Sequence, residues 1–477
     1  MTKDSCVDLE SPPRFKRIEV KGLHGRLDFS VDLHPHLNIL YGKNGLGKTT
    51  FLHIIANLLE LDFRRFNYLK FGEVIARTDR GDGICIRRSK DGMSVLLNDE
   101  PISFIDDANG ISDSDTARLR EAVGNRPAYL PAFRSILERV RDMRTIGYQE
   151  RNNPELEKLT EVERRAILEC ADKSDFYPRS NRDLERAHAT ASKTLQCRQW
   201  FGDFVPAVRY PSVTEVTDGL SDEWRTAQLH INRAEQSLFE GGFLEIFEAI
   251  SVKAEEEQTP QKDILASIYE LLSDESSDAI GPSRSRSYER LVQAAGRQSE
   301  ADAAYNKLLE IYRRVLSERK NVRDDALRPL SEYESSVNKF LDQKKLKIGY
   351  IESSKQTVRA RASFVNVVPT GGRPYGLTAL SSGERQIATM LYSASRSVVP
   401  VGAFLIDEPE LSLHVDWQRI ILLEIQKLHP GRQIIACTHS PEVGADHAEY
   451  VKFFEPSLHV SADSEMEDDR IAGEEEL

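Results

Sequence analysis

A glycine-rich turn near the start of the chain constrains the fold more than any other stretch. Residues 42–50 read Gly-Lys-Asn-Gly-Leu-Gly-Lys-Thr-Thr and fit the pattern G-x-x-x-x-G-K-[ST] at every position. Glycines let backbone N–H groups converge on phosphate oxygens, because no side chain blocks the approach and a positive φ is unstrained. The apolar run 37–41 predicts a buried strand before the turn, and residues 51–59 predict a helix after it. A chance match in a glycine turn would lack this context.

The turn therefore predicts a site for a nucleoside triphosphate with Mg²⁺. We expect Lys48 to reach the β and γ phosphates and Thr49 to ligate the metal ion, while a helix that begins near Thr50 directs its positive end at the nucleotide. The cofactors predicted are ATP and Mg²⁺. The predicted ATP-binding residues are Gly42, Lys43, Asn44, Gly45, Leu46, Gly47, Lys48, Thr49 and Thr50.

A pair of carboxylates follows a second apolar strand, predicted over residues 401–406. Asp407 and Glu408 come directly after it. Because the carboxyl ends of parallel strands meet at one edge of a sheet, both should lie beside the glycine-rich turn. Asp407 can then hold Mg²⁺, and Glu408 can act as general base on the attacking water. Alone, such a pair often only caps a helix; after a phosphate-binding turn, the catalytic interpretation is favoured.

A third apolar strand, residues 433–438, ends at His439. A lone histidine is usually a core or surface residue. Since the strand end places His439 at the same sheet edge as Asp407, a γ-phosphate sensor is favoured. The predicted catalytic residues are thus Glu408, His439 and Lys48, and the predicted metal ligands are Thr49 and Asp407.

Residues 380–386, Leu-Ser-Ser-Gly-Glu-Arg-Gln, open a helix predicted from Gln386 to about Ser395. Two hydroxyls, a glycine and free helical N–H groups make a second anion site, although as a bare helix cap the segment would be unremarkable. Because this site has no nucleotide of its own, we expect it to take a phosphate bound by another subunit. The residues predicted to act in trans are Ser381, Ser382, Gly383 and Glu384.

Composition limits the class of protein. The chain has 477 residues, 40% of them hydrophobic and 30% charged, which is normal for a soluble protein of roughly two to four domains. The longest apolar run, residues 398–406, is too short to span a membrane, and residues 1–16 lack the apolar core of a secretory signal. The five cysteines contain no C-x-x-C pair, so no zinc site or disulfide framework is indicated. We expect a cytoplasmic protein.

The rest of the chain divides by pattern. Residues 14–33 alternate in strand fashion and predict a pair of strands that lead into the strand at 37–41. Residues 68–101 predict an antiparallel β lobe, and strand patterns return at 346–351 and 358–364. Between 142 and 341 apolar residues recur at helical spacing, in runs too short and interrupted for a long coiled-coil arm. The predicted domains are an N-terminal half of the nucleotide-binding head with the β lobe (1–141), a helical insertion that serves as partner or oligomer platform (142–341), the C-terminal half (342–461) and a disordered acidic tail (462–477).

Together these motifs resemble the ABC-type ATPase heads of the SMC and RecF class. Residues 42–49 match the Walker A motif, 380–384 the signature motif (LSSGE where the family has LSGGQ), 404–408 the Walker B motif, and His439 the switch histidine. The resemblance implies an α/β fold: an ABC-type P-loop ATPase head, with a mixed sheet and an antiparallel β lobe, interrupted by a large α-helical insertion. It also implies that two heads sandwich ATP, each completing the other's site.

More narrowly, DEPELSLH at 407–414 with THSPE at 438–442 resembles the ATPase domain of overcoming-lysogenization-defect (OLD) nucleases and of stand-alone relatives in the Septu and PARIS antiphage systems. These act with a TOPRIM or HNH nuclease. The chain ends soon after the histidine strand, so we expect the nuclease effector to be a separate polypeptide. The resemblance implies an ATPase that hydrolyses ATP to ADP and phosphate, assembles into a homo-oligomer of at least two copies, answers to a phage protein or DNA, and involves no membrane.

Two departures and two alternatives stay open. His414 stands where such heads carry a D-loop aspartate, with Asp416 two residues on, and residues 129–134 occupy the Q-loop position without a glutamine. A RecF-like DNA-repair ATPase that clamps duplex DNA is the main alternative; it requires a basic groove, for which Arg284, Arg286, Arg290 and Arg297 are candidates. The net charge of −13 argues against it. A transporter ATPase is disfavoured by the helical insertion.

Overall fold

The computed structural model describes residues 12–89, 92–105, 110–134, 190, 193–251, 261–274, 303–349, 364–396 and 402–459. Internal contacts divide the chain into two units, which we call the head (residues 1–213 with 381–477) and the helical unit (214–380). Compared with the insertion predicted at 142–341, this division begins and ends later along the chain. The predicted acidic tail and most of residues 135–192 lie outside the described residues.

A five-stranded parallel sheet organises the head. Its order is β10 (Ala128–Leu130), β13 (Phe404–Asp407), β14 (Ile434–Thr438), β3 (Leu37–Tyr41) and β15 (Val451–Phe453), and every neighbouring pair is parallel. The central strands are almost continuously apolar, as strands buried on both faces are. The carboxyl ends of β3, β13 and β14 therefore meet at one edge of this sheet, as the sequence predicts.

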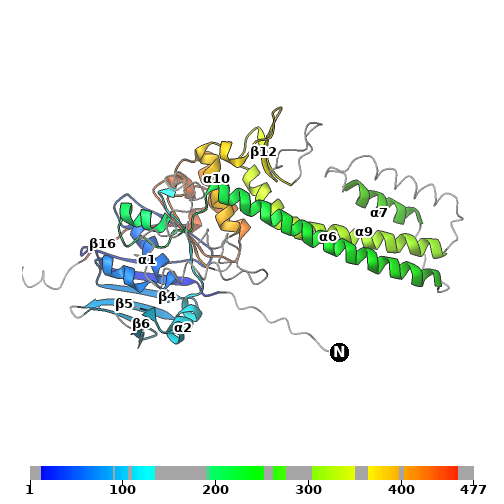
Figure 1. The fold of residues 1–477 in the computed structure, drawn as a ribbon. Coiled ribbons are helices and arrows are strands. Elements are labelled where there is room, and N and C mark those ends of the chain that lie inside the picture. Colours follow the sequence, from blue (N-terminus) through cyan, green and yellow to red (C-terminus); the bar gives the residue numbers. More distant parts are fainter. Residues whose placement is uncertain are drawn as a thin grey trace, which may run out of the picture. The chain divides into compact units, whose positions relative to one another are not determined.

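A seven-stranded antiparallel sheet forms the second layer of the head (Figure 1). Helix α1 (Lys48–Glu60) packs in one core cluster with residues of both sheets, among them Phe29, Ile86 and Leu405. An α-helix that is apolar on nearly all sides is stable only when it is covered all round. The predicted β lobe is confirmed. Its strands are β16 (Ser457–Leu458), β2 (Leu27–Asp32), β1 (Phe15–Leu23), β4 (Glu73–Thr78), β5 (Gly83–Ser89), β6 (Gly92–Leu97) and β7 (Glu100–Pro101).

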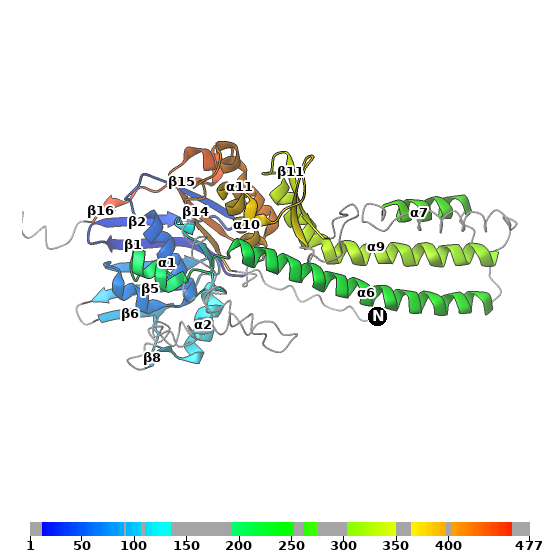
Figure 2. The same ribbon diagram turned by 45° about the horizontal axis from the view of Figure 1, so that its top comes forward.

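Helices α10 (Ser382–Ser395) and α11 (Val415–Leu428) pack against each other, and α10 also contacts β10. Figure 2 shows both helices beside the strands β14 and β15. Together with the two sheets and α1, they complete the α/β head predicted from the sequence. The head's other elements are η1 (Phe63–Tyr68), β8 (Phe104–Ile105), β9 (Gly110–Ile111), α2 (Asp113–Val123), η7 (Pro441–Gly444) and η8 (Ala448–Tyr450).

Two long helices dominate the helical unit, α6 (Val213–Ser251) with 39 residues and α9 (Ala303–Asn338) with 36. The prediction of short, interrupted runs is therefore wrong. The two helices run antiparallel: Arg319 pairs with Glu235, and Ile311 and Val315 pack against Leu238 and Ile246. Packing between helices supplies most of the stability of helices in proteins. It can outweigh the low helix propensity of single glycine or proline residues.

Each of the two long helices contains a residue of low helix propensity. Gly242 lies in α6 where an added Cβ would stand 2.9 Å from Val315 Cγ2, so glycine here admits the close approach of α9. Pro329 lies inside α9 without ending it. The unit also holds α7 (Gln261–Asp274), η6 (Leu377–Ala379), and the antiparallel pair of β11 (Lys344–Ile348) and β12 (Val365–Pro369). The strand predicted at 358–364 lies almost wholly outside the described residues, and β12 begins just after it. Within the described part of the chain, no helix is long and apolar enough to cross a bilayer.

Candidate active site

The glycine-rich turn joins β3 to α1 at the carboxyl edge of the parallel sheet. Gly45 and Gly47 have φ of 82° and 93°, a region that other residues enter only with strain. Gly47 is the N-cap of α1, no side chain caps the helix there, and its first turn holds no acid. The N-terminal N–H groups of α1 are thus available to an anion.

Lys48 is the first residue of α1, two positions before the predicted helix start, and is 6% exposed. Its ammonium group donates to the carbonyl oxygens of Gly42 at 2.7 Å and Lys43 at 2.8 Å. The Lys48 side chain therefore lies along the glycine-rich loop, with which it is predicted to bind phosphate. Of the other loop residues, Lys43, Asn44, Gly45 and Thr49 are exposed, and Leu46 and Thr50 are half-buried.

Thr49 and Asp407 meet across the sheet edge. The Thr49 hydroxyl donates to Asp407 Oδ2 at 2.8 Å. Asp407 is 1% exposed, and its second oxygen, Oδ1, is buried and has no hydrogen-bond partner in the part of the chain that the structure describes. Burial raises the pKa of Asp407 to about 6, because water no longer stabilises the charged form. An unsatisfied buried carboxylate oxygen beside a hydroxyl is a donor set that suits Mg²⁺. These residues fit the predicted metal ion.

Glu408 turns away from that pair. Its φ is 48°, a left-handed conformation that is strained for a residue with a side chain, and its N–H donates to the carbonyl of Cys437 at 2.8 Å. The Glu408 side chain is 26% exposed, and its Oε1 lies 3.4 Å from Nδ1 of His439. Two neighbouring carboxylates of one strand end thus have different partners, which is what separate catalytic tasks require.

Glu410 was not predicted as a site residue. It is 6% exposed, and its Oε1 accepts hydrogen bonds from the Thr438 hydroxyl at 2.6 Å and from the N–H groups of His439 and Ser440 at 3.0 and 3.1 Å. The same oxygen lies 3.1 Å from His439 Nδ1. Glu410 therefore fixes the turn that presents His439. The signal in the sequence was a third acid, two residues beyond Glu408.

Arg134 was also missed. It follows β10, is 0% exposed, and donates to the backbone carbonyls of Asp407, Glu408 and Pro409. Burial lowers the pKa of Arg134. The sequence indicated only the surrounding segment, residues 129–134, as the place of the Q-loop. In the structure a strand of three residues, β10, is followed there by a turn.

The signature segment begins its helix earlier than predicted. Helix α10 starts at Ser382, and Ser381 is its N-cap. The Glu384 carboxylate accepts from the N–H of Ser381 at 2.9 Å, while the Ser381 hydroxyl accepts from the N–H of Glu384. Glu384 is buried, and Ser381 and Ser382 are exposed. An added Cβ on Gly383 would stand 2.6 Å from the Ser412 carbonyl, so this glycine is required for packing. Contact of the segment with a nucleotide on another subunit stays a prediction.

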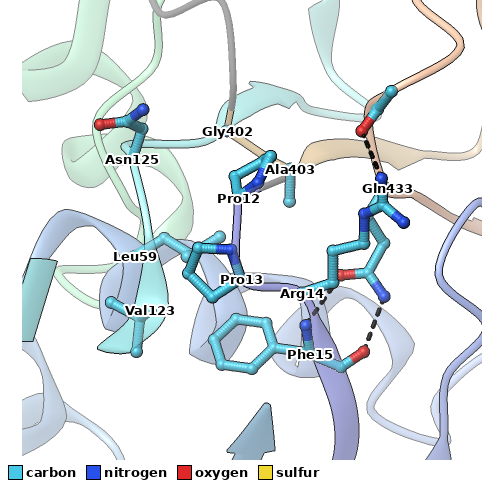
Figure 3. Close-up of a pocket in the computed structure, with 11 residues that line it drawn as sticks. Pro12, Pro13, Arg14, Phe15, Leu59, Val123, Asn125, Gly402, Ala403 and Gln433 are labelled. Atoms are coloured by element: carbon cyan, nitrogen blue, oxygen red, sulfur yellow. Dashed lines mark hydrogen bonds between the residues drawn. The ribbon is translucent and has the colours of Figure 1, made fainter. Parts of the chain in front are cut away.

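A small hollow lies at the opposite edge of the parallel sheet, lined among others by Pro13, Leu59 and Ala403 (Figure 3). Gln433 borders it and is fully bonded: its Oε1 accepts from the N–H of Phe15, and its Nε2 donates to the carbonyls of Phe15 and His34. No predicted site residue lines this hollow. Its polar lining serves to join β1 to the parallel sheet.

Comparison with known proteins agrees with the site. A family model described as "AAA domain, putative AbiEii toxin, Type IV TA system" matches residues 245–446, which is less than half of the chain. The "Retron Ec83 probable ATPase" of Escherichia coli is 28% identical over 152 residues, 29% of this chain and 28% of the relative. The chain thus matches little more than a quarter of that relative's length. With the geometry of the site, these matches support ATPase activity.

Two solved structures are similar over nearly the whole chain, at low scores. The Smc head domain of Pyrococcus furiosus, with an extended coiled coil and bound to the C-terminal domain of ScpA, is 13% identical, with 96% of this chain and 99% of that chain covered and a TM-score of 0.38. The recombination mediator protein RecF is 12% identical, with 91% and 94% covered and a TM-score of 0.32. The assignment of the fold rests on the order of the strands in the parallel sheet and on the sequence motifs. The chain has the fold of an ABC-type P-loop ATPase head.

Proposed function

We propose that this protein binds and hydrolyses ATP at the carboxyl edge of the parallel sheet. The observation that carries the proposal is the hydrogen bond between Thr49 and Asp407, which joins residues 358 positions apart in the chain into one metal-binding pair. Lys48 and the N–H groups of the loop bind the phosphates, and Thr49 and Asp407 hold Mg²⁺. The metal ion neutralises charge on the β and γ phosphates when it is bound. Glu408 accepts the proton of the attacking water.

A second copy of the chain completes the site in this proposal. Ser381 and Ser382 are exposed at the start of α10, so they are accessible to a nucleotide held by another head. Glu384 instead holds the start of α10, because its carboxylate accepts a hydrogen bond from the N–H of Ser381. The functional state is then a homo-oligomer of at least two copies, closed by ATP.

We infer further that the ATPase is the sensor or scaffold subunit of a bacterial antiphage system and controls a separate nuclease. Support comes from the OLD-like motifs at 407–414 and 438–442, from the matched family description and from the retron relative. The nuclease is of the TOPRIM or HNH type, the trigger is a phage protein or DNA, and the protein works in the cytoplasm. ATP binding and hydrolysis change how tightly the ATPase binds the nuclease, as in other nucleotide-controlled switches.

The test is a pull-down of tagged Glu408→Gln protein from cells that carry the native neighbouring genes, with mass spectrometry and nucleic-acid analysis of the eluate. Lys48→Ala is the matched control, since it removes nucleotide binding at the same site. We expect a stoichiometric nuclease with Glu408→Gln and less of it with Lys48→Ala.

The other outcomes are decisive too. Duplex DNA without a nuclease, lost at higher salt, would replace the defence proposal by a RecF-like clamp. Neither DNA nor a nuclease in the Glu408→Gln eluate would refute the effector proposal, while ATP turnover by the purified wild-type protein would still stand as a separate measurement.

A further inference from the structure

We propose that Arg134 is a positioning residue, which holds the catalytic carboxylates in place by fixing the backbone that carries them. The inference rests on the proposed ATPase function. It assigns a role to the segment after β10, where the sequence places the Q-loop but offers no glutamine.

The guanidinium group bonds a run of consecutive carbonyls. Its Nη1 donates to Asp407 O at 2.9 Å and its Nη2 to Glu408 O at 2.8 Å and Pro409 O at 3.1 Å. A weaker bond from Nη1 to Pro131 O, at 3.3 Å, ties the same group to its own turn. The guanidinium group presents five N–H donors in a fixed planar fork, more than the three donors of a lysine ammonium group, and so suits a run of consecutive carbonyls better.

These carbonyls need such a partner. Asp407 is the last residue of β13, so beyond it the carbonyls leave the pairing of the parallel sheet, and buried carbonyls must be satisfied in another way. The register of the sheet places Arg134 beside them: Leu130 of β10 pairs with Ile406 of β13. Arg134 therefore takes over where the ladder of strand hydrogen bonds ends.

Placing a cation here is costly. Arg134 is 0% exposed, and apolar side chains fill buried space without the desolvation penalty of a guanidinium. A residue that served packing alone would not need the charge. The charge does suit a site at which the carboxylates of Asp407, Glu408 and Glu410 all act on Arg134 and raise its pKa against the effect of burial.

Arg134 would affect the reaction by holding the backbone of Glu408. That backbone has a φ of 48°, a strained conformation that persists only when the surroundings impose it. Bonds from Arg134 to the carbonyls of Asp407, Glu408 and Pro409 help to impose it, together with the bonds from the Glu408 N–H to Cys437 O and from the Leu411 N–H to Glu408 O. Without the bonds from Arg134 we expect the turn to relax, which would move Glu408 away from His439 and disturb the contact of Asp407 with Thr49.

The experiment compares Arg134→Met and Arg134→Lys with Arg432→Met in the full chain. Arg432 is a matched control: it is 3% exposed, stacks on Phe404 of the same strand, and donates to a backbone carbonyl, that of Ala394, but it stands at the opposite edge of the sheet. The measurements are thermal unfolding, the Kd for ATP, the turnover number, and the electron paramagnetic resonance spectrum of Mn²⁺ bound with a non-hydrolysable ATP analogue.

We expect both Arg134 variants to bind ATP within about threefold of wild type while turnover falls about 100-fold, the usual effect of misplacing a catalytic group by about 1 Å. The Mn²⁺ spectrum should change in both, because the Asp407 carboxylate shifts. Arg432→Met should lower the unfolding temperature but leave the turnover number and the spectrum unchanged.

Three results would overturn the proposal: wild-type turnover and spectrum in the Arg134 variants, equal losses in Arg432→Met, or failure of both Arg134 variants to fold while Arg432→Met folds, which would make Arg134 a residue of the fold alone. A wild-type protein that binds Mn²⁺ and ATP without turnover would contradict the proposed hydrolysis instead, and the spectra would still decide the role of Arg134.

Discussion

Buried amides at the amino edge of the parallel sheet and buried carboxylates at its carboxyl edge differ in how their oxygen atoms are bonded. At the amino edge, Asn38 is 0% exposed, its Oδ1 accepts from the N–H of His34, and its Nδ2 donates to the carbonyls of His34 and Ile434. Gln433 is satisfied in the same manner. At the carboxyl edge, Asp407 Oδ1 and Glu410 Oε2 are buried, and neither oxygen has a hydrogen-bond partner among the described residues.

This difference separates structural from functional polarity. A closed set of hydrogen bonds stabilises the fold and leaves nothing for a ligand, whereas an unsatisfied buried oxygen is costly to the fold and is kept where a ligand completes it. At the carboxyl edge the backbone is strained as well, since Glu408 has a positive φ. Substitutions at the carboxyl edge should therefore alter ATP chemistry, and those at the amino edge should alter stability alone.

The largest effect should come from Lys48→Ala. The ammonium group is the one buried cation of the phosphate loop and would make charge-assisted hydrogen bonds to phosphate, so its loss should abolish measurable ATP binding and raise the Kd at least about 100-fold. Titration calorimetry measures this directly. Lys43→Ala is the control, because Lys43 is exposed and offers the loop only its backbone; a similar loss there would show that net charge alone matters.

Glu408→Gln should remove turnover and spare binding. The amide keeps the size of the side chain but cannot accept the proton of water, and loss of a general base typically costs about 100-fold or more in rate. Single-turnover hydrolysis and the Kd for ATP, measured on the same preparation, separate the two effects. Normal turnover in this variant would remove Glu408 as the base.

Local signals in the sequence account for much of this site. The run 37–41, the glycine turn and the helix after it could be predicted because each has its own pattern of residues, and the placement of Asp407 and His439 at one edge followed from the rule that carboxyl ends of parallel strands meet. The β lobe was predictable for the same reason, since alternation is a local property.

The remaining parts depend on contacts that no local pattern records. Arg134 bonds the carbonyl of Glu408, and Glu410 bonds the N–H of His439 on a neighbouring strand end. Both partners are backbone groups, which every residue has, so the sequence does not reveal these bonds. The lengths of α6 and α9 were underestimated because these helices are stabilised by packing between segments far apart in the chain, such as the pairing of Arg319 with Glu235, which no local pattern shows.

Glu410→Ala should have an intermediate effect, with turnover lower by about tenfold. It removes the acceptor that the Thr438 hydroxyl and the N–H groups of His439 and Ser440 share. The Thr438 hydroxyl and the Ser440 N–H keep weaker or second bonds to each other's residue, whereas the His439 N–H loses this bond, and an unsatisfied buried donor costs about 1–3 kcal/mol. The His439 turn should loosen as a result. Glu410→Gln is the matched variant, since its amide oxygen can still accept these bonds; if it loses as much activity as alanine, the charge of Glu410 and not its acceptor function is what matters.

Gln433→Leu should have the smallest effect on chemistry and so tests the comparison most sharply. Leucine fills similar space but leaves the N–H and carbonyl of Phe15 and the carbonyl of His34 without the partner they have in the wild type, so the free energy of unfolding should fall by about 1–3 kcal/mol. Turnover should stay within about twofold of wild type, because the substitution is at the opposite edge from Asp407 and Glu408. Denaturant unfolding and steady-state hydrolysis on one sample measure both quantities. A loss of turnover equal to that of Glu410→Ala, in protein that is still folded, would mean that the two edges are mechanically coupled and that hydrogen-bond closure does not distinguish a structural polar group from a functional one in this sheet.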